Sequence, residues 1–536
     1  MKLYNSYTNQ IEEFEPINDN KVNMYVCGPT VYDFAHLGHA RCYITWDMVV
    51  RYLRFRGYDV TYARNVTDVD DKIIAKANAQ NTTPEAIAGQ YYEEFTKSMD
   101  ALNCLKPDLE PMATKTIGDM IGLVKKLEAQ GFAYAVDGDV FFRVTKFKDY
   151  GKLSNQRIED LESGARVDAD ERKESPLDFA LWKSAKEGEI SWSSPWGKGR
   201  PGWHLECSAM INKVFKGETI DIHAGGQDLL FPHHENEIAQ SACAFGKQFV
   251  KYWMHNGFVT INEEKMSKSL GNFVTINKLL EKYDANTIRF FILTNHYRMP
   301  VGFNDEALSS AQNAVKKLHG IVQEVSVLAQ KNNIDIELKR KYIKEFLQNK
   351  ISTGEKETLD KNDSISPSKM EVDAFIEAMD NDFNTSKALS SLFYYLREAK
   401  KLINAEKPLY SDNNIDDGSW MIAYLLELSE ILGFNFETKI EKQIDYPSIK
   451  EKLLTFIKSD EIVSKSFLGE TLLAGSGNIP QGDKESFEYA LNLLITSRNK
   501  AREAKVWEYS DKIRDGLLAI GIVIKDTKEG TTWTIE

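Results

Sequence analysis

The sequence predicts an α/β region built on a parallel sheet and split by an insertion, followed by an α-helical bundle and a small C-terminal α+β module. In the first 90 residues, and again after residue 201, strand-like segments alternate with amphipathic helical ones, an order typical of parallel sheets. From about residue 304 the apolar residues recur almost only at steps of three and four, which indicates packed helices. A chain of 536 residues is also long enough for several domains.

Two strand–helix units open the α/β region. The segment VNMYVCG (residues 22–28) is a short β-type apolar run ended by Gly-Pro, and residues 40–55 follow with apolar side chains at helical spacing. The order repeats with a strand over residues 59–66 and a helix over residues 69–79. Because each strand is followed by a helix, we expect the two strands to run parallel.

An insertion of different character follows over residues 91–201. It holds helical stretches, the β-like segment GDVFFRV (residues 138–144) and a polar loop rich in Arg, Asp and Glu. The α/β pattern then resumes with a strand over residues 219–226 that ends in glycines. A helix opened by Pro232 is expected next, since proline is favoured in the first turn of a helix.

The remaining chain is predicted to be mainly helical. Residues 378–403 carry apolar side chains at three- and four-residue steps, as one helical stretch would. Residues 351–369 are polar and broken by Gly and Pro, which favours a mobile loop. The last stretch, residues 501–536, pairs an amphipathic helix with two β-like segments around a turn at residues 528–530. We therefore expect a small closing module.

Composition limits where this protein works and what it binds. The five cysteines stand in a long chain with no signal-peptide pattern, so reduced thiols are expected rather than disulfides. No apolar run approaches the roughly 18 residues needed to cross a bilayer. We therefore expect a cytoplasmic protein with no membrane partner. The formal charge of −13 argues against a general nucleic-acid binder, so any RNA contact is expected to be local.

The most specific motif is EEKMSKSLGN (residues 263–272). Lys265 and Lys268 lie three apart in a Ser-rich segment, a pattern suited to neutralising a polyphosphate as charge develops on the leaving group. A short motif needs structural support, because a solvated basic loop has the same composition. We predict that both lysines are catalytic.

A second motif lies at the first strand–helix junction. In CGPTVYDFAHLGHAR (residues 27–41), His36 and His39 bracket Gly38. Such a junction suits ATP, because a helix N-terminus offers free N–H groups to phosphate and glycine permits close approach. Imidazoles can stabilise charge on the transferred phosphoryl group. By itself, this pair of histidines is equally compatible with local packing or capping.

A third set of residues has the chemistry of metal ligands. His233 and Glu237 stand four apart on an expected helix, so both project from one face, and zinc accepts imidazole, carboxylate and thiolate ligands. Cys27 and Cys207 would supply the thiolates, although free cysteines are often simply buried. His234 competes with His233, and the position one turn from Glu237 favours His233.

These motifs together resemble class I aminoacyl-tRNA synthetases, of which HLGH and KMSKS are hallmarks. MYVCGPTVYDFAHLGHAR, NVTDVDDKII, PGWHLECSAM, DLLFPHHENEIAQS and EEKMSKSLGN look like the cysteinyl-tRNA synthetase set, in order along residues 22 to 310. The implied domains are the first half of a Rossmann-like catalytic domain (1–90), a connective insertion (91–201), the second half of the catalytic domain (202–258), a KMSKS stem-contact region (259–310), a helical bundle with polar insertions (311–485) and a C-terminal anticodon-binding module (486–536).

The resemblance also implies a reaction and its cofactors. Such an enzyme activates L-cysteine with ATP and Mg²⁺, then transfers it to the 3′-terminal ribose of tRNA(Cys). Cys27, Cys207, His233 and Glu237 would hold one Zn²⁺ per chain, which the substrate thiolate would also bind. The resemblance assigns ATP binding to His36, Gly38, His39 and Lys268, and substrate binding to Gly28, Thr30, Thr67, Trp203 and Asp228.

Two of these assignments have simpler alternatives. Trp203 is a residue type that is mostly buried, so ordinary core packing would also explain it. Thr67 would also serve as the N-cap of the following helix.

RNA contacts are expected in the tail. Basic residues cluster around Trp507, and the predicted tRNA-binding residues are Arg498, Arg502, Trp507 and Arg514. Charge beside an exposed aromatic suits an unpaired base, although a solvated helix face has the same composition. A ligase that joins cysteine to an amino sugar would lack this tail, and a non-catalytic tRNA-binding relative would be expected to have lost HLGH or KMSKS. We expect the enzyme to be a monomer.

Overall fold

The computed structural model describes residues 1–157, 170–261, 264–265, 273–354, 366–405, 413–436, 446–460, 463, 482–527 and 530–535. The chain forms two compact units, Met1–Glu437 and Thr438–Glu536. None of the described helices has the length and apolar character needed to cross a membrane.

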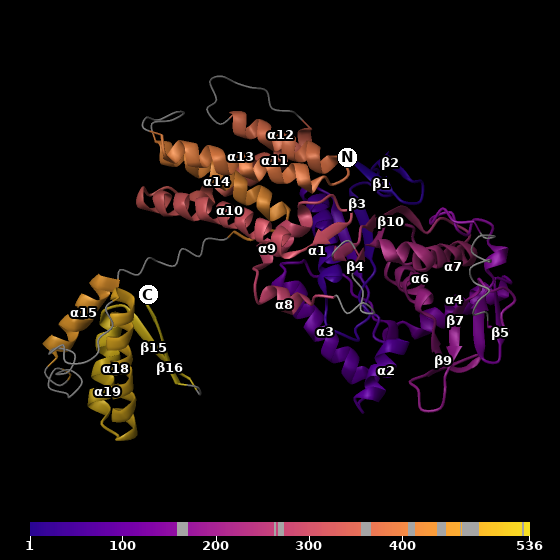
Figure 1. The fold of residues 1–536 in the computed structure, drawn as a ribbon, viewed down its shortest axis with the longest axis horizontal. Helices are drawn as coiled ribbons and strands as arrows, with labels where there is room; N and C mark the ends of the chain where they lie inside the picture. Colours follow the sequence, from indigo (N-terminus) through magenta and orange to yellow (C-terminus); the bar gives the residue numbers. More distant parts are fainter. Residues whose placement is uncertain are drawn as a thin grey trace. The chain divides into compact units, whose positions relative to one another are not determined.

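A parallel four-stranded sheet forms the centre of the first unit, which confirms the predicted fold class (Figure 1). Its order is β11-β10-β3-β4, with bounds Val250–Asn256, Ile220–Gly226, Lys21–Val26 and Asp59–Arg64. The strands are almost wholly buried, as expected for a sheet covered by helices. Parallel pairing brings the carboxyl ends of β3, β4 and β10 to one edge.

Helix α1, Leu37–Phe55, connects β3 to β4 and lies beside the sheet (Figure 1). Helix α2 spans Asp71–Ala79 after β4, and both predicted helices are confirmed. The expectation that Pro232 opens a helix is confirmed. Leu230–His234 are a π-helical stretch that leads directly into helix α7, Glu235–Phe245, and within this stretch Phe231 has extended backbone angles, so the helical backbone before α7 starts at Pro232.

The insertion builds its own antiparallel sheet, in the order β5-β6-β7-β9-β8. Its strands are Ala133–Val136 (β5), Asp139–Phe142 (β6), Phe179–Ser184 (β7), Trp192–Ser194 (β8) and Gly197–Pro201 (β9). Helices α3 (Pro84–Ala101) and α4 (Ile117–Ala129) precede this sheet. Helix α6 (Trp203–Val214) returns the chain to the central sheet.

A small sheet follows β11, in the order β13-β12-β14. Strand β12 is Val259–Ile261, β13 is Glu264–Lys265 and β14 is Val301–Phe303. Helices α8 (Ile276–Leu280) and α9 (Ala285–Leu293) lie between β13 and β14 in the sequence. At the N-terminus, β1 (Lys2–Asn5) and β2 (Gln10–Glu13) form a hairpin.

Helices α10 to α14 form the predicted bundle, and α9 lies between the bundle and α1 (Figure 1). The bundle helices are α10 (Asp305–Lys331), α11 (Ile336–Thr353), α12 (Ser366–Asp380), α13 (Thr385–Ile403) and α14 (Asn414–Ile431). The helical character predicted for residues 378–403 is confirmed, with a break between α12 and α13 where Asp382 and Phe383 take positive φ angles of 57° and 52°.

The ends of the loop predicted for residues 351–369 belong to helices α11 and α12, so the loop is shorter than predicted. Residues 355–365 lie outside the described part of the chain.

The second unit confirms the predicted closing module. Helices α15 (Tyr446–Ser459), α18 (Asp483–Glu503) and α19 (Trp507–Ala519) pack on an antiparallel hairpin of β15 (Ile522–Thr527) and β16 (Gly530–Ile535). Its core contains Leu453, Phe487, Leu491, Ile513 and Ile522. Of the turn predicted at residues 528–530, residues 528–529 lie outside the described residues.

Candidate active site

The site lies where the carboxyl ends of β3 and β4 approach each other. The backbone N–H of Gly28 donates to Asn65 Oδ1 at 2.7 Å. A Cβ on Gly28 would lie 1.5 Å from the Asn65 carbonyl oxygen, so only glycine permits this contact. Cys27 precedes it and is fixed to β10 through its N–H, which donates to the Ala224 carbonyl at 3.1 Å. The strand ends therefore fix the Cys27 thiol at the switch point of the sheet.

The four predicted metal ligands come together below this edge. Cys27, Cys207, His233 and Glu237 are all buried, and their ligand atoms lie within 4.8 Å of one another. The Cys27 and Cys207 Sγ atoms are 3.8 Å apart, and His233 Nε2 is 3.1 Å from Glu237 Oε1. Helix α6 carries Cys207 and α7 carries Glu237. Two thiols, an imidazole and a carboxylate in one buried cluster fit a zinc ion.

A second group of ligand atoms overlaps the first. Cys27, His223, His234 and Glu237 also lie within 4.8 Å of one another. His234 Nε2 is 3.3 Å from Cys27 Sγ, and His223 Nε2 is 2.9 Å from Glu237 Oε2. No sequence pattern pointed to His223, because a lone His in an apolar strand has the pattern of a core residue.

Protons are unevenly distributed over this cluster. Burial raises the pKa of the Cys27 thiol, whereas a hydrogen bond from Cys27 lowers the pKa of Cys207 to about 6. Burial by itself would lower the pKa of His233, but its bonds with Cys207 and Glu237 raise it to about 10. Burial would likewise raise the pKa of Glu237, yet the charges and hydrogen bonds of His223 and His233 lower it to about 2. A thiolate and a carboxylate are therefore available to a cation at neutral pH.

A cavity of about 340 Å³ connects this cluster with the HLGH motif. It is the site suggested by the sequence, and the predicted residues in its wall are Cys27, Gly28, Thr30, His36, Gly38, His39, Trp203 and Asp228. A volume of this size suits a small ligand. Most of the residues that are predicted to bind the amino acid or the nucleotide are scattered in the sequence, and they meet in the wall of this one cavity.

His36 and His39 cap helix α1 in addition to lining the cavity. His36 Nδ1 accepts from the Gly38 N–H at 3.2 Å, and His39 Nδ1 accepts from the His36 N–H at 3.1 Å. This reciprocal arrangement is a capping box made of histidines. Because both Nδ1 atoms are acceptors, each neutral ring carries its proton on Nε2. The capping interpretation is thus confirmed, and it orients both rings as donors.

Trp203 and Thr67 differ in exposure. Trp203 is 40% exposed and stacks on His233 with ring centroids 4.3 Å apart, so core packing does not explain it. Thr67 is 2% exposed, and its hydroxyl donates to Glu206 Oε2 at 2.6 Å. Helix α2 is capped by Asp70, so the alternative role of Thr67 as its N-cap is wrong. Thr67 therefore supports the base of the site through Glu206.

The lysine motif is described only at its start. Lys265 lies in β13, opposite Thr260 of β12, and nothing is described of its side chain. Lys268 lies outside the described residues.

Sequence reasoning missed several residues of the cavity wall. Asn256, Gly257 and Phe258 form a strip that leads from β11 to β12, and Lys72 and Arg41 lie in the wall as well. Arg41 and Lys72 stand in the motifs CGPTVYDFAHLGHAR and NVTDVDDKII, but neither residue type at its position pointed to the cavity by itself. The short sequence distance from Arg41 to His39 was the one available signal.

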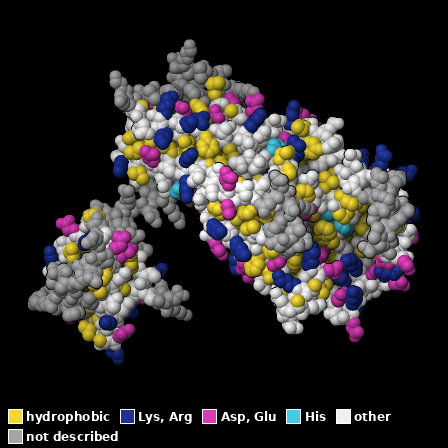
Figure 2. All heavy atoms as spheres, in the orientation of Figure 1, with side chains coloured by type: hydrophobic (Ala, Val, Ile, Leu, Met, Phe, Trp, Pro, Cys, Tyr) yellow, Lys and Arg dark blue, Asp and Glu magenta, His cyan; other side chains and the backbone are white. Residues whose placement is uncertain are grey.

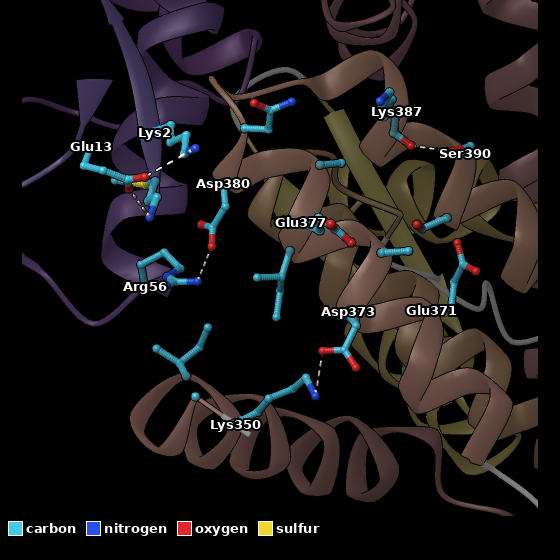
Figure 3. Close-up of a pocket in the computed structure, with 18 residues that line it drawn as sticks. Lys2, Glu13, Arg56, Lys350, Glu371, Asp373, Glu377, Asp380, Lys387 and Ser390 are labelled. Carbon is cyan, nitrogen blue, oxygen red and sulfur yellow. Dashed lines mark hydrogen bonds and ion pairs between the residues drawn. The ribbon is translucent and has the colours of Figure 1, made fainter. Parts of the chain in front are cut away.

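A larger cavity of about 800 Å³ lies between the N-terminal hairpin and helices α11 to α13 (Figure 3). Its charged side chains pair with one another: Arg56 with Asp380 at 2.8 Å, and Lys350 with Asp373 at 2.8 Å. None of the predicted site residues lines it. It therefore has no evident part in the chemistry of the first cavity.

Surface charge is mixed over the visible face of the first unit, where Lys and Arg alternate with Asp and Glu (Figure 2). In the second unit Arg498 is only 5% exposed, and both its Nη atoms bind Asp526 at 3.0 Å. Arg502 binds the same carboxylate. Trp507 is 56% exposed and Arg514 is half exposed. Among the predicted RNA-binding residues, Arg502, Trp507 and Arg514 are thus accessible, whereas Arg498 is buried in its ion pair with Asp526.

Comparisons with known proteins agree with the site. A family model described as tRNA synthetases class I (C) catalytic domain matches residues 13–313. A DALR domain matches residues 374–437, and a cysteinyl-tRNA ligase anticodon binding domain matches residues 485–533.

Full-length relatives and solved structures give the same picture. The chain is 42% identical over 535 residues to a cysteine–tRNA ligase of Actinobacillus pleuropneumoniae serotype 5b (strain L20), with 99% of each chain covered. It is 44% identical over 536 residues to one of Trichlorobacter lovleyi, with 100% of each covered. Mycobacterium tuberculosis methionyl-tRNA synthetase, solved with methionyl-adenylate, shares the fold with a TM-score of 0.54 at 17% identity, covering 77% of this chain and 90% of that one.

Proposed function

Because the chain belongs to the cysteine–tRNA ligase family of class I aminoacyl-tRNA synthetases, it is an enzyme that joins cysteine to tRNA, and we propose which residues carry each step. The observation that supports the assignment is one cavity whose wall contains both the HLGH histidines and Cys27 of the buried ligand cluster. An ATP site and a thiol site in a single cavity suit amino-acid activation.

The thiol site selects cysteine. Cys27, Cys207, His233 and Glu237 would hold one Zn²⁺, and the metal would supply a Lewis acid for the thiolate of the substrate. Trp203, stacked on His233, covers the thiol pocket. Serine offers a hydroxyl that scarcely ionises at neutral pH, so it is rejected at binding. Recognition of such a distinctive group gives roughly 10⁴ to 10⁵ of selectivity without editing.

In the first step, a carboxylate oxygen of cysteine attacks the α-phosphorus of ATP and the bond to pyrophosphate breaks. His36 and His39 donate from Nε2 to the phosphate oxygens, since their Nδ1 atoms are occupied by the helix cap. Lys265 and Lys268 neutralise the leaving pyrophosphate together with Mg²⁺. Gly28, Thr30, Thr67 and Asp228 position the amino acid or the nucleotide.

In the second step, the terminal ribose of tRNA(Cys) attacks the adenylate carbonyl through its 2′-hydroxyl, and AMP leaves. The second unit contacts the anticodon region, with exposed Trp507 available to stack on a base and Arg514 and Arg502 available to phosphate. We further propose that the enzyme acts as a monomer in the cytoplasm and that its domains follow the boundaries predicted from the sequence.

The test is cysteine-dependent ATP/pyrophosphate exchange on zinc-loaded protein, followed by charging of tRNA. Wild type is expected to exchange with cysteine and not with serine, and to charge tRNA. A Cys207→Ser variant is expected to lose zinc and exchange together. Exchange without charging would indicate another acceptor, such as an amino sugar. No exchange by folded, zinc-loaded protein would refute the proposed active site.

A further inference from the structure

A buried arginine connects the helix that carries the HLGH histidines to the cavity wall on the opposite side. Arg41 lies on α1, two residues after His39, and is 1% exposed. Its guanidinium donates to four main-chain carbonyls of one segment, residues 292–299. The acceptors are the oxygens of Ile292 at 2.8 Å, His296 at 3.0 Å, Tyr297 at 2.9 Å and Met299 at 3.1 Å.

That segment supports the cavity wall directly. The Tyr297 carbonyl, already bound by Arg41, also accepts from the Gly257 N–H at 2.8 Å. A Cβ on Gly257 would lie 2.6 Å from the Met299 carbonyl oxygen, so the two backbones are in close contact. Gly257 and its neighbours line the cavity. The Tyr297 carbonyl therefore accepts hydrogen bonds both from the Arg41 guanidinium and from the Gly257 N–H of the cavity wall.

The same segment leads into the strands beside the lysine motif. After residue 299 the chain forms β14, which pairs in parallel with β12, and β12 pairs with β13, which contains Lys265. Thr260 of β12 stands between Gly302 and Lys265. A continuous set of main-chain hydrogen bonds thus runs from Arg41 to the strand of Lys265.

The chemistry of Arg41 is unusual for a residue that only stabilises the fold. Among the described residues no carboxylate forms an ion pair with it, and its Nε has no hydrogen-bond partner. Burial lowers its pKa to about 10, so it still carries its charge at neutral pH. Burying a charge without a counter-charge costs stability, and an apolar side chain would fill the space without that cost.

We propose that Arg41 is a positioning residue for the ATP-dependent step, which holds the β12–β13 strands and the Gly257 strip at a fixed distance from His36 and His39. This inference rests on the proposed ATP site. Phosphoryl-group chemistry depends steeply on such spacing, because a displacement of about 1 Å can cost roughly 100-fold in rate. The ligands of the thiol pocket come from other elements, because Cys27 follows β3, Cys207 lies on α6 and Glu237 lies on α7, and none of these described residues bonds the 292–299 segment.

The experiment compares Arg41→Lys with a matched control, Arg56→Lys. Both arginines are on or next to α1, but Arg56 binds Asp380 beside the other cavity (Figure 3). ATP/pyrophosphate exchange is measured with kcat and KM for each substrate, normalised to the number of active sites that form adenylate, together with bound zinc. Arg41→Lys is expected to lower kcat about 10- to 100-fold, with the cysteine KM and the zinc content unchanged. Arg56→Lys is expected to match wild type.

A second variant keeps the proposal testable if Arg41→Lys does not fold. In Gly257→Ala the added Cβ would clash with the Met299 carbonyl, which also accepts a hydrogen bond from Arg41. This variant is expected to show the same fall in kcat with an unchanged cysteine KM. An unchanged kcat per active site in either folded variant would overturn the proposal, as would a fall that Arg56→Lys reproduces. Wild-type protein without exchange would instead refute the proposed ATP site itself.

Discussion

At the scale of single residues, His36 has two separable roles. Its Nδ1 caps α1 by accepting from the Gly38 N–H, and its Nε2 is assigned to the phosphates of ATP. Most helix caps are Ser, Thr, Asp or Asn, which have no second donor at the far side of a ring. An imidazole at this position therefore combines the structural bond of the cap with a second donor, which we propose is catalytic.

Replacing His36 by Asn is expected to separate these roles. Asn is a favoured N-cap, so the free energy of unfolding should fall by only a few tenths of a kcal/mol, whereas the rate of adenylate formation should fall about 100-fold. His36→Ala should lose the same rate and, in addition, about 1 kcal/mol of stability. Urea unfolding and single-turnover adenylate formation measure the two effects. Full activity in His36→Asn would show that the ring has no catalytic part.

The contacts of the buried histidines could not be predicted from the sequence around each histidine alone. His223 and His255 lie in strands β10 and β11, in apolar runs that have the pattern of core strands. Their connection to the ligand cluster depends on pairing across the sheet, which brings His255 Nε2 to 2.8 Å from His234 Nδ1. The four proposed ligands were predictable from residue type, spacing and the family resemblance together, but the histidines that contact them were not.

At the scale of elements, the contact between the ends of β3 and β4 determines the site. Gly28→Ala is expected to separate these ends, because its Cβ would overlap the Asn65 carbonyl. The loss of unfolding free energy should reach at least about 1–3 kcal/mol, with loss of bound zinc because Cys27 moves as well. Differential scanning calorimetry and metal analysis report both.

Gly89→Ala is the matched control for that substitution. Gly89 lies in helix α3 with open space around its Cβ position, so alanine there should stabilise the protein by roughly 0.5–1 kcal/mol. If Gly28→Ala behaved like Gly89→Ala, the close approach of the two strands would be unnecessary.

The hairpin of the second unit depends on Asp526 and on pH. Hydrogen bonds from Arg498 hold the pKa of Asp526 well below its usual value. Because the folded-state pKa is depressed, this stabilisation is fully present above the unfolded pKa near ~3.9, declines below it, and is lost as pH falls through the depressed folded pKa. Asp526 is 40% exposed, so water screens the pair and limits it to about 1 kcal/mol.

Hydrogen exchange of strand β15 tests this account. Asp526→Asn should speed exchange about fivefold at neutral pH, and the difference from wild type should shrink as pH falls below ~3.9 and disappear only below the depressed pKa of folded Asp526. Asp515→Asn, which removes an exposed pair with Arg514, should have no effect. A difference between Asp526→Asn and wild type that persists in acid would contradict an ionic origin.

Element boundaries were predictable where local signals and packing agree. Strands β3, β4 and β10 and helices α1 and α2 follow from apolar patterns with Gly or Asp at their ends. The break between α12 and α13 was missed, because the helical spacing of apolar residues continues across it. Asp382 takes its positive φ there while accepting hydrogen bonds from Tyr297 and Arg298, which are distant in sequence. Periodicity carries no information about such tertiary partners.

At the scale of the whole molecule, activation and tRNA recognition are assigned to different units. Trp507→Ala should therefore raise the KM for tRNA about 5- to 100-fold by removing one stacking surface, and leave cysteine-dependent exchange unchanged. Leu518→Ala, an equally exposed residue at the other end of α19, should affect neither. A parallel loss of exchange in Trp507→Ala would contradict the separation of roles.

The order of domains was predictable from the sequence because each has its own periodicity. The role of Arg498 was not, since its partner Asp526 is distant in sequence and meets it only in the folded hairpin. Arg498 therefore looked like a surface cation although it is buried.

The central claim is that the buried cysteines, with His233 and Glu237, recognise the substrate thiol through a metal. Replacing zinc by cobalt(II) tests it most directly, because thiolate ligands give cobalt a charge-transfer absorption whose intensity follows their number. We predict a band in wild-type protein that is weaker in Cys207→Ser and that increases when L-cysteine is added but not when L-serine is added. A band whose intensity does not change when L-cysteine is added, or increases equally when L-serine is added, would contradict the account.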